Sequence, residues 1–266
     1  MLASICGPAP PWWPSAREPS PTPGYQSGSL KILDQILAEL ILALDVPRGD
    51  DALRLLDRLP QLRWVKVGPI LMTREGPDFI RQLVARGLTV FLDLKWHDIP
   101  NTVAGAVMAA RELGVAMATV HTLGGTPMLE AAAVAAGHEL ALIGVTVLTS
   151  HDPVGYARAV GRSKVDVPRE VERQALAAAE AGLRGIVCSP HEVSLLRRRL
   201  GPDLYIVVPG IRRRSDLNSD QARVATAKDA VGNGATHLVV GRPVIQSADP
   251  VAAFEEFMKE AQCAGS

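Results

Sequence analysis

The sequence of 266 residues predicts a (β/α)8 barrel, the TIM-barrel fold. From residue 41 onward, eight short apolar runs rich in β-branched residues recur, each followed by a segment with helical spacing. Because the runs are apolar throughout instead of alternating, they are typical of strands buried on both faces of a parallel sheet. Hydrophobic residues make up 47% of the chain and aromatic residues only 4%, which indicates an aliphatic core. Eight strands alternating with helices over roughly 225 residues match a closed barrel.

The predicted strands follow one another at regular intervals along the chain. They cover residues 41–46, 64–68, 89–95, 117–122, 141–149, 185–189, 205–210 and 237–242. The alternative is an open doubly wound sheet, which usually has fewer strands and a glycine-rich turn after the first one. Here Asp45-Val46-Pro47 closes the first run, and the only GxG, at residues 232–234, precedes a strand. The barrel is therefore the favoured architecture.

The segments between the strands carry signals for helix ends. Gly76-Pro77 and Asp249-Pro250 each predict the start of a helix, because proline is favoured in the first helical turn. Residues 189–192 (SPHE) have the pattern of a capping box with proline at the first helical position. Residues 29–40 place apolar side chains at helical spacing, so we expect a short helix that closes the bottom of the barrel.

The amino-terminal segment differs in composition from the rest. Seven of the 20 prolines lie in the first 30 residues. Such a segment cannot bury enough apolar surface to offset its ordering entropy, so we expect residues 1–28 to be a disordered extension and residues 29–266 to be a single barrel domain. Prolines also interrupt every apolar run in the extension, which argues against a secretory signal. The pair Trp12-Trp13 is either a docking motif or part of a dispensable tail.

Charge and cysteine content restrict the partners and the compartment. Lys plus Arg (28) balance Asp plus Glu (28), so no overall field attracts the protein to nucleic acid or to an anionic membrane. The three cysteines are far apart, with no spacing that fits zinc. They indicate a reducing compartment, which predicts a cytoplasmic protein. Cys188 lies in an apolar run and is expected to be a core residue.

Charged residues concentrate where the predicted strands end, and this is the end of such a barrel that carries the chemistry. Asp93 and Lys95 are two apart on one strand, so their side chains should point the same way into the mouth. Lys66 lies one strand over, Asp45 ends the first strand, and Asp98 follows the third. Alternating acids and bases keep one another ionised. A structural ion-pair network is the alternative, but its place at the functional end favours chemistry.

The sequence gives less support to catalysis by a bound metal ion or by a nucleophilic side chain. Asp93, His97 and Asp98 could supply metal ligands, but Lys95 would place a competing cation among them. Neither HExxH nor GxSxG occurs. His121 and His237 lie in apolar runs and are expected to be hydrogen-bonded core residues. No metal and no organic cofactor is therefore predicted.

The last two strands indicate a phosphate site. In barrels of this type, the loops after strands seven and eight often bind phosphate through backbone N–H groups. Gly210 and Gly241 allow close approach of the backbone, while Arg212 and Arg242 supply charge. The polar loop between Arg212 and Gln221 is long enough to close over a bound phosphate. A solvated surface loop would explain Arg213 and Arg214, but it explains Arg212 less well.

These residues resemble a known family. The stretch DLKWHDIPNT at 93–102 looks like the signature of the orotidine 5'-phosphate decarboxylases. Five further motifs resemble that family's pattern in the same order. They are LALDVP (42–47), VKVG (65–68), VTVLTS (145–150), VVPGIR (207–212) and VVGRPV (239–244). The resemblance covers about residues 40–262.

The resemblance implies decarboxylation of orotidine 5'-phosphate to UMP and CO2, in de novo pyrimidine biosynthesis, without a cofactor. It implies a charged catalytic tetrad of Lys66, Asp93, Lys95 and Asp98, with Lys95 protonating the C6 carbanion. It also implies a homodimer with shared active sites, in which Asp98 and Thr102 reach the partner's site. The implied substrate contacts are Asp45 and Lys66 to ribose, Thr149 to the pyrimidine, and Arg212, Gln221, Gly241 and Arg242 to the phosphate.

Two other functions remain open from the sequence. The DxKxxD pattern at 93–98 is shared with related sugar-phosphate decarboxylases and hexulose-phosphate synthases of the same barrel superfamily, which would require magnesium. A barrel that only binds UMP-like ligands is the alternative that is not an enzyme. Turnover and its dependence on Mg²⁺ distinguish these possibilities.

Overall fold

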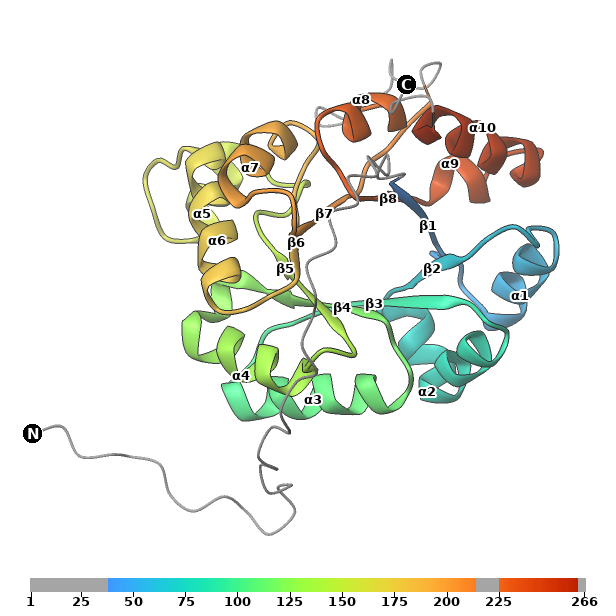
Figure 1. The fold of residues 1–266 in the computed structure, drawn as a ribbon, viewed down its shortest axis with the longest axis horizontal. Coiled ribbons are helices and arrows are strands. Elements are labelled where there is room, and N and C mark those ends of the chain that lie inside the picture. Colours follow the sequence, from blue (N-terminus) through green and yellow to red (C-terminus); the bar gives the residue numbers. More distant parts are fainter. Residues whose placement is uncertain (1–37, 214–224, 263–266) are drawn as a thin grey trace, which may run out of the picture. The chain divides into compact units, whose positions relative to one another are not determined.

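The computed structural model describes residues 38–213 and 225–262, which form a closed barrel of eight parallel strands in chain order (Figure 1). Pairing of β1 with β8, with Ile41 opposite Val239, closes the sheet. The predicted fold class is confirmed. The strands are β1 (Glu39–Ala43), β2 (Trp64–Val67), β3 (Thr89–Trp96), β4 (Met117–His121), β5 (Ala141–Val145), β6 (Gly185–Val187), β7 (Tyr205–Val208) and β8 (His237–Val240).

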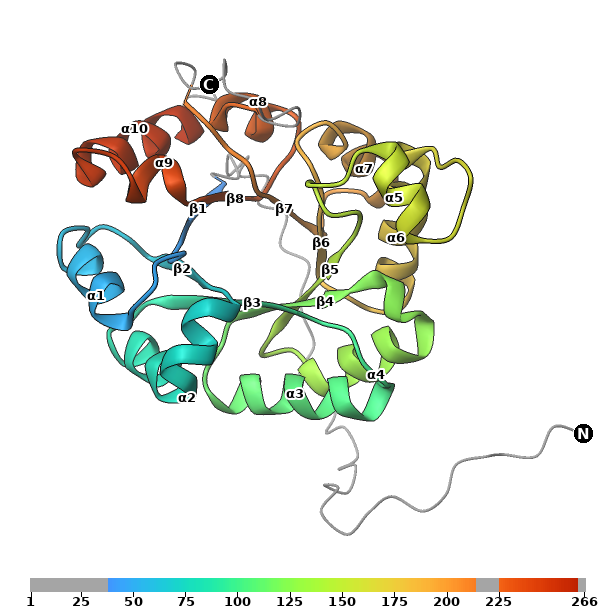
Figure 2. The same cartoon turned by 180° about the vertical axis from the view of Figure 1, so that it is seen from behind.

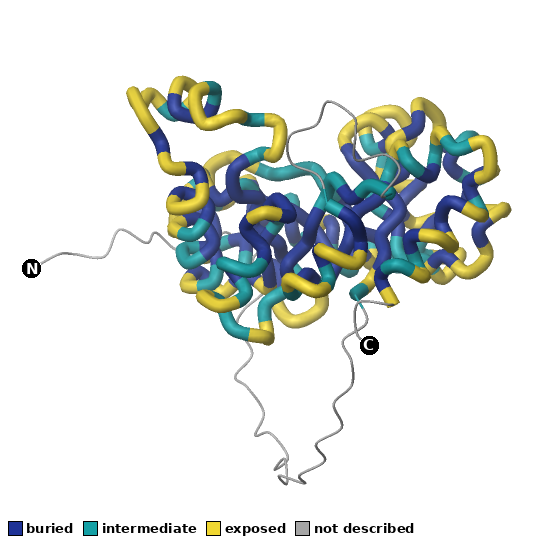
Figure 3. Tube along the Cα trace, turned by 90° about the horizontal axis from the view of Figure 1, so that it is seen from above, coloured by how far each residue is buried: buried dark blue, intermediate teal, exposed yellow. Residues whose placement is uncertain are grey.

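Helices surround the strands in an outer ring, visible from both ends of the barrel (Figures 1 and 2). They are α1 (Gly49–Asp57), α2 (Pro69–Ala85), α3 (Pro100–Glu112), the 3-10 turn η1 (Thr122–Gly124), α4 (Thr126–Ala136), α5 (Pro153–Ala159), α6 (Val167–Glu180), α7 (Val193–Leu200), α8 (Ala227–Gly232), α9 (Arg242–Ile245) and α10 (Pro250–Gln262). Burial concentrates along the strands and the inner helix faces, while the outer helix faces are exposed (Figure 3). Within the described ranges, no helix is long and apolar enough to cross a membrane.

The core has two parts separated by the strands. The larger part packs the outer strand faces against the helices and includes Ile80, Leu83 and Phe257, all fully buried. The smaller part fills the barrel interior, so the barrel has a packed centre instead of a pore. The interior side chains are those of Ile41, Ala43, Phe91, Met117, Ile143, Val207 and Val239.

All eight predicted strands are present, but several end earlier than predicted. β1 ends at Ala43 and β5 at Val145, three and four residues before the predicted ends. After β5, Val147 and Leu148 line the mouth of the barrel, whereas Leu44 and Val46 after β1 pack into the core, so the apolar pattern continues beyond the end of both strands. β1 also begins at Glu39, so Leu40 lies in a strand and the predicted helix over 29–40 is wrong at its carboxyl end. The rest of that helix and the 1–28 extension lie outside the described residues.

The helix signals are mostly confirmed. Gly76 has φ 69° and breaks α2, so that a new helical run begins at Pro77. The Asp249 carboxylate accepts hydrogen bonds from the N–H groups of Val251 and Ala252 at the start of α10. The capping box is displaced: Glu192 accepts from the Ser189 N–H at 2.9 Å, but α7 begins only at Val193. The box therefore closes the turn before the helix.

The amino end of the barrel holds a buried histidine. His237, at the start of β8, is 5% exposed and meets the rings of Trp64 and Tyr205 edge-on. Its Nδ1 lies 2.9 Å from the hydroxyl of Thr236. Burial lowers the pKa of His237 from 6.5 to about 4. The imidazole is therefore neutral in the folded protein, as expected for a core histidine.

We expect His237 to make the folded protein less stable in mild acid. In the unfolded chain this histidine protonates as the pH falls through 6.5, whereas in the folded protein it stays neutral down to about pH 4. Between pH 8 and pH 5 this difference should lower the free energy of unfolding by roughly 2 kcal/mol. Urea denaturation of the native protein and His237→Gln at both pH values measures this. Equal pH slopes for the two proteins would contradict the assignment.

Candidate active site

A cavity of about 800 Å³ opens at the carboxyl ends of the strands. Its wall comes from residues at the ends of seven strands, those of β1, β2, β3, β5, β6, β7 and β8. Eight of the residues predicted for catalysis or substrate binding line it. They are Asp45, Lys66, Asp93, Lys95, Thr149, Arg212, Gly241 and Arg242.

Four of these residues form a row of alternating charge. The Lys66 Nζ lies 3.2 Å from Asp45 Oδ1 and 3.3 Å from Asp93 Oδ2. The Lys95 Nζ lies 2.8 Å from Asp93 Oδ1. The side chains of Lys66 and Asp93 are 11% and 13% exposed, and that of Lys95 is 37% exposed. The most accessible ammonium of the row therefore faces the cavity at the end of the β3 strand.

The Asp93 carboxylate is the most buried anion of the row. Burial alone would raise its pKa, but the charges of Lys66 and Lys95, with hydrogen bonds from Lys95 and Thr119, outweigh that effect and lower the pKa. Asp93 is therefore ionised at neutral pH.

The backbone of β3 changes direction at this point. Lys95 has φ 53°, the only positive φ of a non-glycine residue in the described ranges, and the register between β3 and β4 shifts between Leu92 and Trp96. Such a conformation costs on the order of 1–3 kcal/mol and persists only when its surroundings hold it. Lys95 and Asp93 do face the same way, as predicted, but through an irregular strand instead of a regular pleat.

Thr119 on β4 holds this irregular backbone. Its buried hydroxyl accepts a hydrogen bond from the Lys95 N–H at 2.9 Å and donates one to Asp93 Oδ1 at 3.1 Å. Thr119 was not predicted as a site residue because it lies inside an apolar strand, 26 residues from Asp93. The only signal in the sequence is a polar residue in the middle of the otherwise apolar run MATV at 117–120.

Asp98 and Thr102 lie apart from the row. Both are exposed, neither lines the cavity of this chain, and the Asp98 carboxylate accepts a hydrogen bond from the N–H of Ile99. Three members of the predicted tetrad thus meet within one chain, and the fourth does not. The assignment of Asp98 and Thr102 to a neighbouring subunit's site stays a prediction.

The residues predicted to bind phosphate follow β7 and β8. Gly210 has φ 79°, a conformation that favours glycine, and Gly241 lies beside Asp45, where a Cβ would make only ordinary van der Waals contact. The Arg212 N–H donates to the Ala225 carbonyl at 3.0 Å, which joins the two ends of the segment between them. Gln221 lies outside the described residues.

The histidines near the mouth form a stacked pair. The rings of His97 and His121 lie 5.6 Å apart with an interplanar angle of 24°. Burial, followed by the charges of His97 and Lys95, lowers the pKa of His121. The Nδ1 of His121 accepts from the Leu123 N–H, so His121 is hydrogen-bonded as predicted, but it is only partly buried and is not the core residue that was expected. Over residues 38–213 and 225–262, no group of three or more His, Cys, Asp or Glu side chains is arranged to hold a metal ion.

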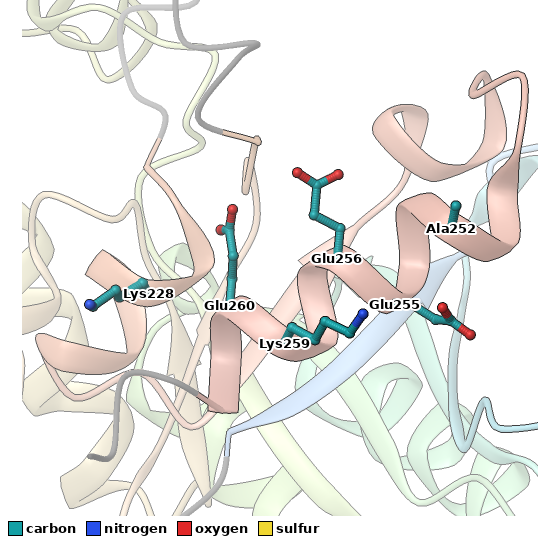
Figure 4. A pocket seen from close by; sticks show the side chains of 6 residues that line it. All are labelled: Lys228, Ala252, Glu255, Glu256, Lys259 and Glu260. Atoms are coloured by element: carbon teal, nitrogen blue, oxygen red, sulfur yellow. The ribbon is translucent and has the colours of Figure 1, made fainter.

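A second hollow of about 400 Å³ lies on the outside of the barrel, between α8 and α10 (Figure 4). Its wall is mainly charged side chains, among them Lys228, Glu256 and Lys259. No residue predicted for catalysis or substrate binding lines it. The cavity at the strand ends is therefore the candidate active site.

Fold and site together define a (β/α)8 barrel with an acid–base row at the carboxyl ends of its strands. The sequence profile described as "Orotidine 5'-phosphate decarboxylase / HUMPS family" matches residues 38–257. The chain belongs to this family.

Several relatives named orotidine 5'-phosphate decarboxylase align with most of the chain. An orotidine 5'-phosphate decarboxylase of Halorhodospira halophila is 49% identical over 231 residues, 85% of this chain and 97% of that protein. One of Opitutus terrae is 46% identical over 230 residues, 84% and 97% of the two chains. The crystal structure of orotidine 5'-phosphate decarboxylase from Lactobacillus acidophilus matches with a TM-score of 0.73 and 34% identity, over 84% of this chain and 99% of that one.

We expect Thr119→Val to destabilise the protein although it preserves the side-chain shape. The Lys95 N–H would lose its acceptor at a strained position, which costs about 1–3 kcal/mol. Thr119→Ser, which keeps the hydroxyl, should lose less. Urea denaturation at pH 7 measures both variants. If Thr119→Val and the native protein unfolded at the same urea concentration, Thr119 would not support the Lys95 backbone.

Proposed function

We propose that this chain converts orotidine 5'-phosphate to UMP and CO2, as a carboxy-lyase of pyrimidine biosynthesis. The observation that carries the proposal is the row of Lys66, Asp93 and Lys95 in a cavity of about 800 Å³. The matching relatives, which carry the same printed activity over most of this chain, support it.

The chemistry requires stabilisation of a localised carbanion. The bond between C6 of the pyrimidine and its carboxylate breaks, CO2 leaves, and the electron pair stays on C6 outside the ring's π system. The Lys95 ammonium stabilises this charge and then donates a proton to C6. Asp93 Oδ1 accepts a hydrogen bond from the Lys95 Nζ at 2.8 Å and so holds this ammonium group at the cavity wall.

Asp93 has a second role in the proposal. Its ionised carboxylate lies where the carboxylate of the substrate would come close, and the repulsion is relieved when CO2 leaves. Binding energy from remote parts of the substrate offsets this unfavourable placement. Asp45 and Lys66 would contact the ribose hydroxyls, and Thr149 the pyrimidine.

The phosphate supplies most of that remote binding energy. Arg212, Gly241 and Arg242 line the cavity on the β7 and β8 side, away from Lys95. Together with Gln221 they would hold the 5'-phosphate through charge-assisted and backbone hydrogen bonds. The proposed reaction uses only side chains of the protein, without a metal or an organic cofactor.

We also propose that the active protein is a homodimer with shared sites. Asp98 and Thr102 lie outside their own cavity, and two large apolar side chains near them, Ile99 and Leu123, are 66% and 41% exposed. Such side chains at the same end of the barrel suit an interface between two copies, which would place Asp98 in the partner's site. We further propose that it acts in the cytoplasm, consistent with its few, widely spaced cysteines.

The activity prediction separates chemistry from phosphate binding. Purified protein treated with EDTA should convert orotidine 5'-phosphate at an undiminished rate, measured as loss of the ultraviolet absorbance that the orotate ring has and the uracil ring of UMP lacks. Lys95→Ala should lower kcat by several orders of magnitude, whereas Arg242→Ala should mainly raise KM. Equal kinetic profiles of the two variants would contradict the division of roles. Turnover of a sugar phosphate that depends on Mg²⁺, or binding of UMP with no turnover, would contradict the proposed reaction.

The dimer prediction uses two variants that are inactive alone. Lys95→Ala damages a site from its own chain, and Asp98→Asn damages the partner's site. After the two are mixed and allowed to exchange subunits, half of the sites in each mixed dimer are intact, so about a quarter of native activity should return. Absence of any recovery in a mixture shown by mass spectrometry to contain mixed dimers would contradict shared sites.

A further inference from the structure

A buried polar network lies beside the active-site cavity, outside the charged row. At its centre is Gln174 of α6, which is 2% exposed. The Gln174 Nε2 donates to the hydroxyl of Tyr156 at 2.7 Å and to Glu170 Oε1 at 3.0 Å. The Gln174 Oε1 lies 2.7 Å from the hydroxyl oxygen of Thr122. The same hydroxyl oxygen lies 2.8 Å from the carbonyl oxygen of Val145.

The network joins three consecutive elements, β5, α5 and α6, to the earlier turn η1. Val145 is the last residue of β5, Thr122 follows β4, Tyr156 lies on α5, and Gln174 and Glu170 lie on α6. Glu170 is held by Arg173 and by Arg162, whose Nη1 is 3.3 Å from Glu170 Oε2. The hydrogen bond from Arg173 is the main cause that lowers the pKa of Glu170 to about 2, so this carboxylate accepts hydrogen bonds at any pH near neutral.

The two ends of the β5–α5 loop are both attached to this network. The loop, residues 146–152, begins after Val145 and ends before Pro153 of α5. Residues 147–152 all line the cavity, and Thr149 and Ser150 at its tip are exposed. At the far end, the ring of Tyr156 packs edge-on against His151 at 5.9 Å. Across the tip, the His151 N–H donates to the Leu148 carbonyl at 3.0 Å, and the network contacts the chain at Val145 before the loop and at Tyr156 after it.

We infer that Tyr156, Gln174 and Glu170 are positioning residues that hold the β5–α5 loop against the cavity. Through this loop they determine the affinity of the site for the base of the nucleotide. The inference rests on the proposed function, because that function places a pyrimidine beside Thr149. Gly241 and Arg242, which are predicted to bind the phosphate, follow β8, whereas the network is built from residues of β5, η1, α5 and α6. We therefore expect the network to affect the binding of the base and to leave the binding of the phosphate unchanged.

The test compares two ligands that share the phosphate end. UMP carries the base and ribose 5-phosphate lacks it, and titration calorimetry measures the Kd of each. Tyr156→Phe removes one hydroxyl and leaves a buried Gln174 N–H without its acceptor. We expect it to weaken UMP binding about 5–10-fold and to change ribose 5-phosphate binding less than about twofold. The kcat/KM for orotidine 5'-phosphate should fall with the UMP affinity.

A matched control distinguishes positioning from loss of stability. Tyr205→Phe makes the same chemical change at the amino end of the barrel, where Tyr205 contacts His237. It should leave the ratio of the two dissociation constants as in the native protein. If Tyr156→Phe weakens both ligands equally, or neither, the positioning role is wrong. Gln174→Leu should reproduce the selective loss, and Tyr156→Phe decides alone if Gln174→Leu does not fold.

Hydrogen exchange makes the inference testable apart from the enzymatic activity. Without ligand, the amides of residues 146–152 should exchange faster in Tyr156→Phe than in the native protein, and those of β7 and β8 should not change. Unchanged exchange in the loop would overturn the positioning role. If the native protein failed to bind UMP while the loop still exchanged faster in the variant, the proposed function would fail and the control of the loop would stand.

Discussion

The ionised Asp93 carboxylate between Lys66 and Lys95 is the interaction on which the site depends. A buried carboxylate is costly unless it is paired and hydrogen-bonded, and here two ammonium groups and the Thr119 hydroxyl meet that requirement. In general, a buried ion pair is often no more stabilising than well-packed apolar residues of similar volume. The row is therefore better explained by the charge it presents to the cavity than by the stability it adds.

The parallel barrel makes this arrangement possible because the carboxyl ends of all its strands lie at the same end of the barrel. Asp45, Lys66 and Asp93 come from the end regions of three successive strands, and the Lys66 Nζ lies 3.2 Å from one carboxylate and 3.3 Å from the other. The other end of the barrel contains no such array among the described residues and instead buries His237 between Trp64 and Tyr205. Chemistry and packing are thus separated along the barrel axis, in agreement with the division known for this fold.

The loops around the mouth differ in what supports them. The β5–α5 loop is attached at both ends to buried hydrogen bonds of Gln174 and its neighbours, whereas the segment after Arg212 is joined across its base by the Arg212 to Ala225 hydrogen bond. In the proposed function, the buried network supports the wall of the cavity on the side where the base would lie.

Local patterns in the sequence were sufficient for the fold and for most of the site. Eight apolar runs predicted the eight strands, and the charged residues at their ends predicted Asp45, Lys66, Asp93 and Lys95, because a parallel barrel collects its strand ends whatever the details of packing. Only the tertiary structure revealed the positive φ of Lys95, the support from Thr119, the separation of Asp98 from its own cavity, and the contact of Thr122 with Gln174 across 52 residues. These features depend on strand register and on contacts between distant residues, and a pattern of period two or 3.6 carries no information about either.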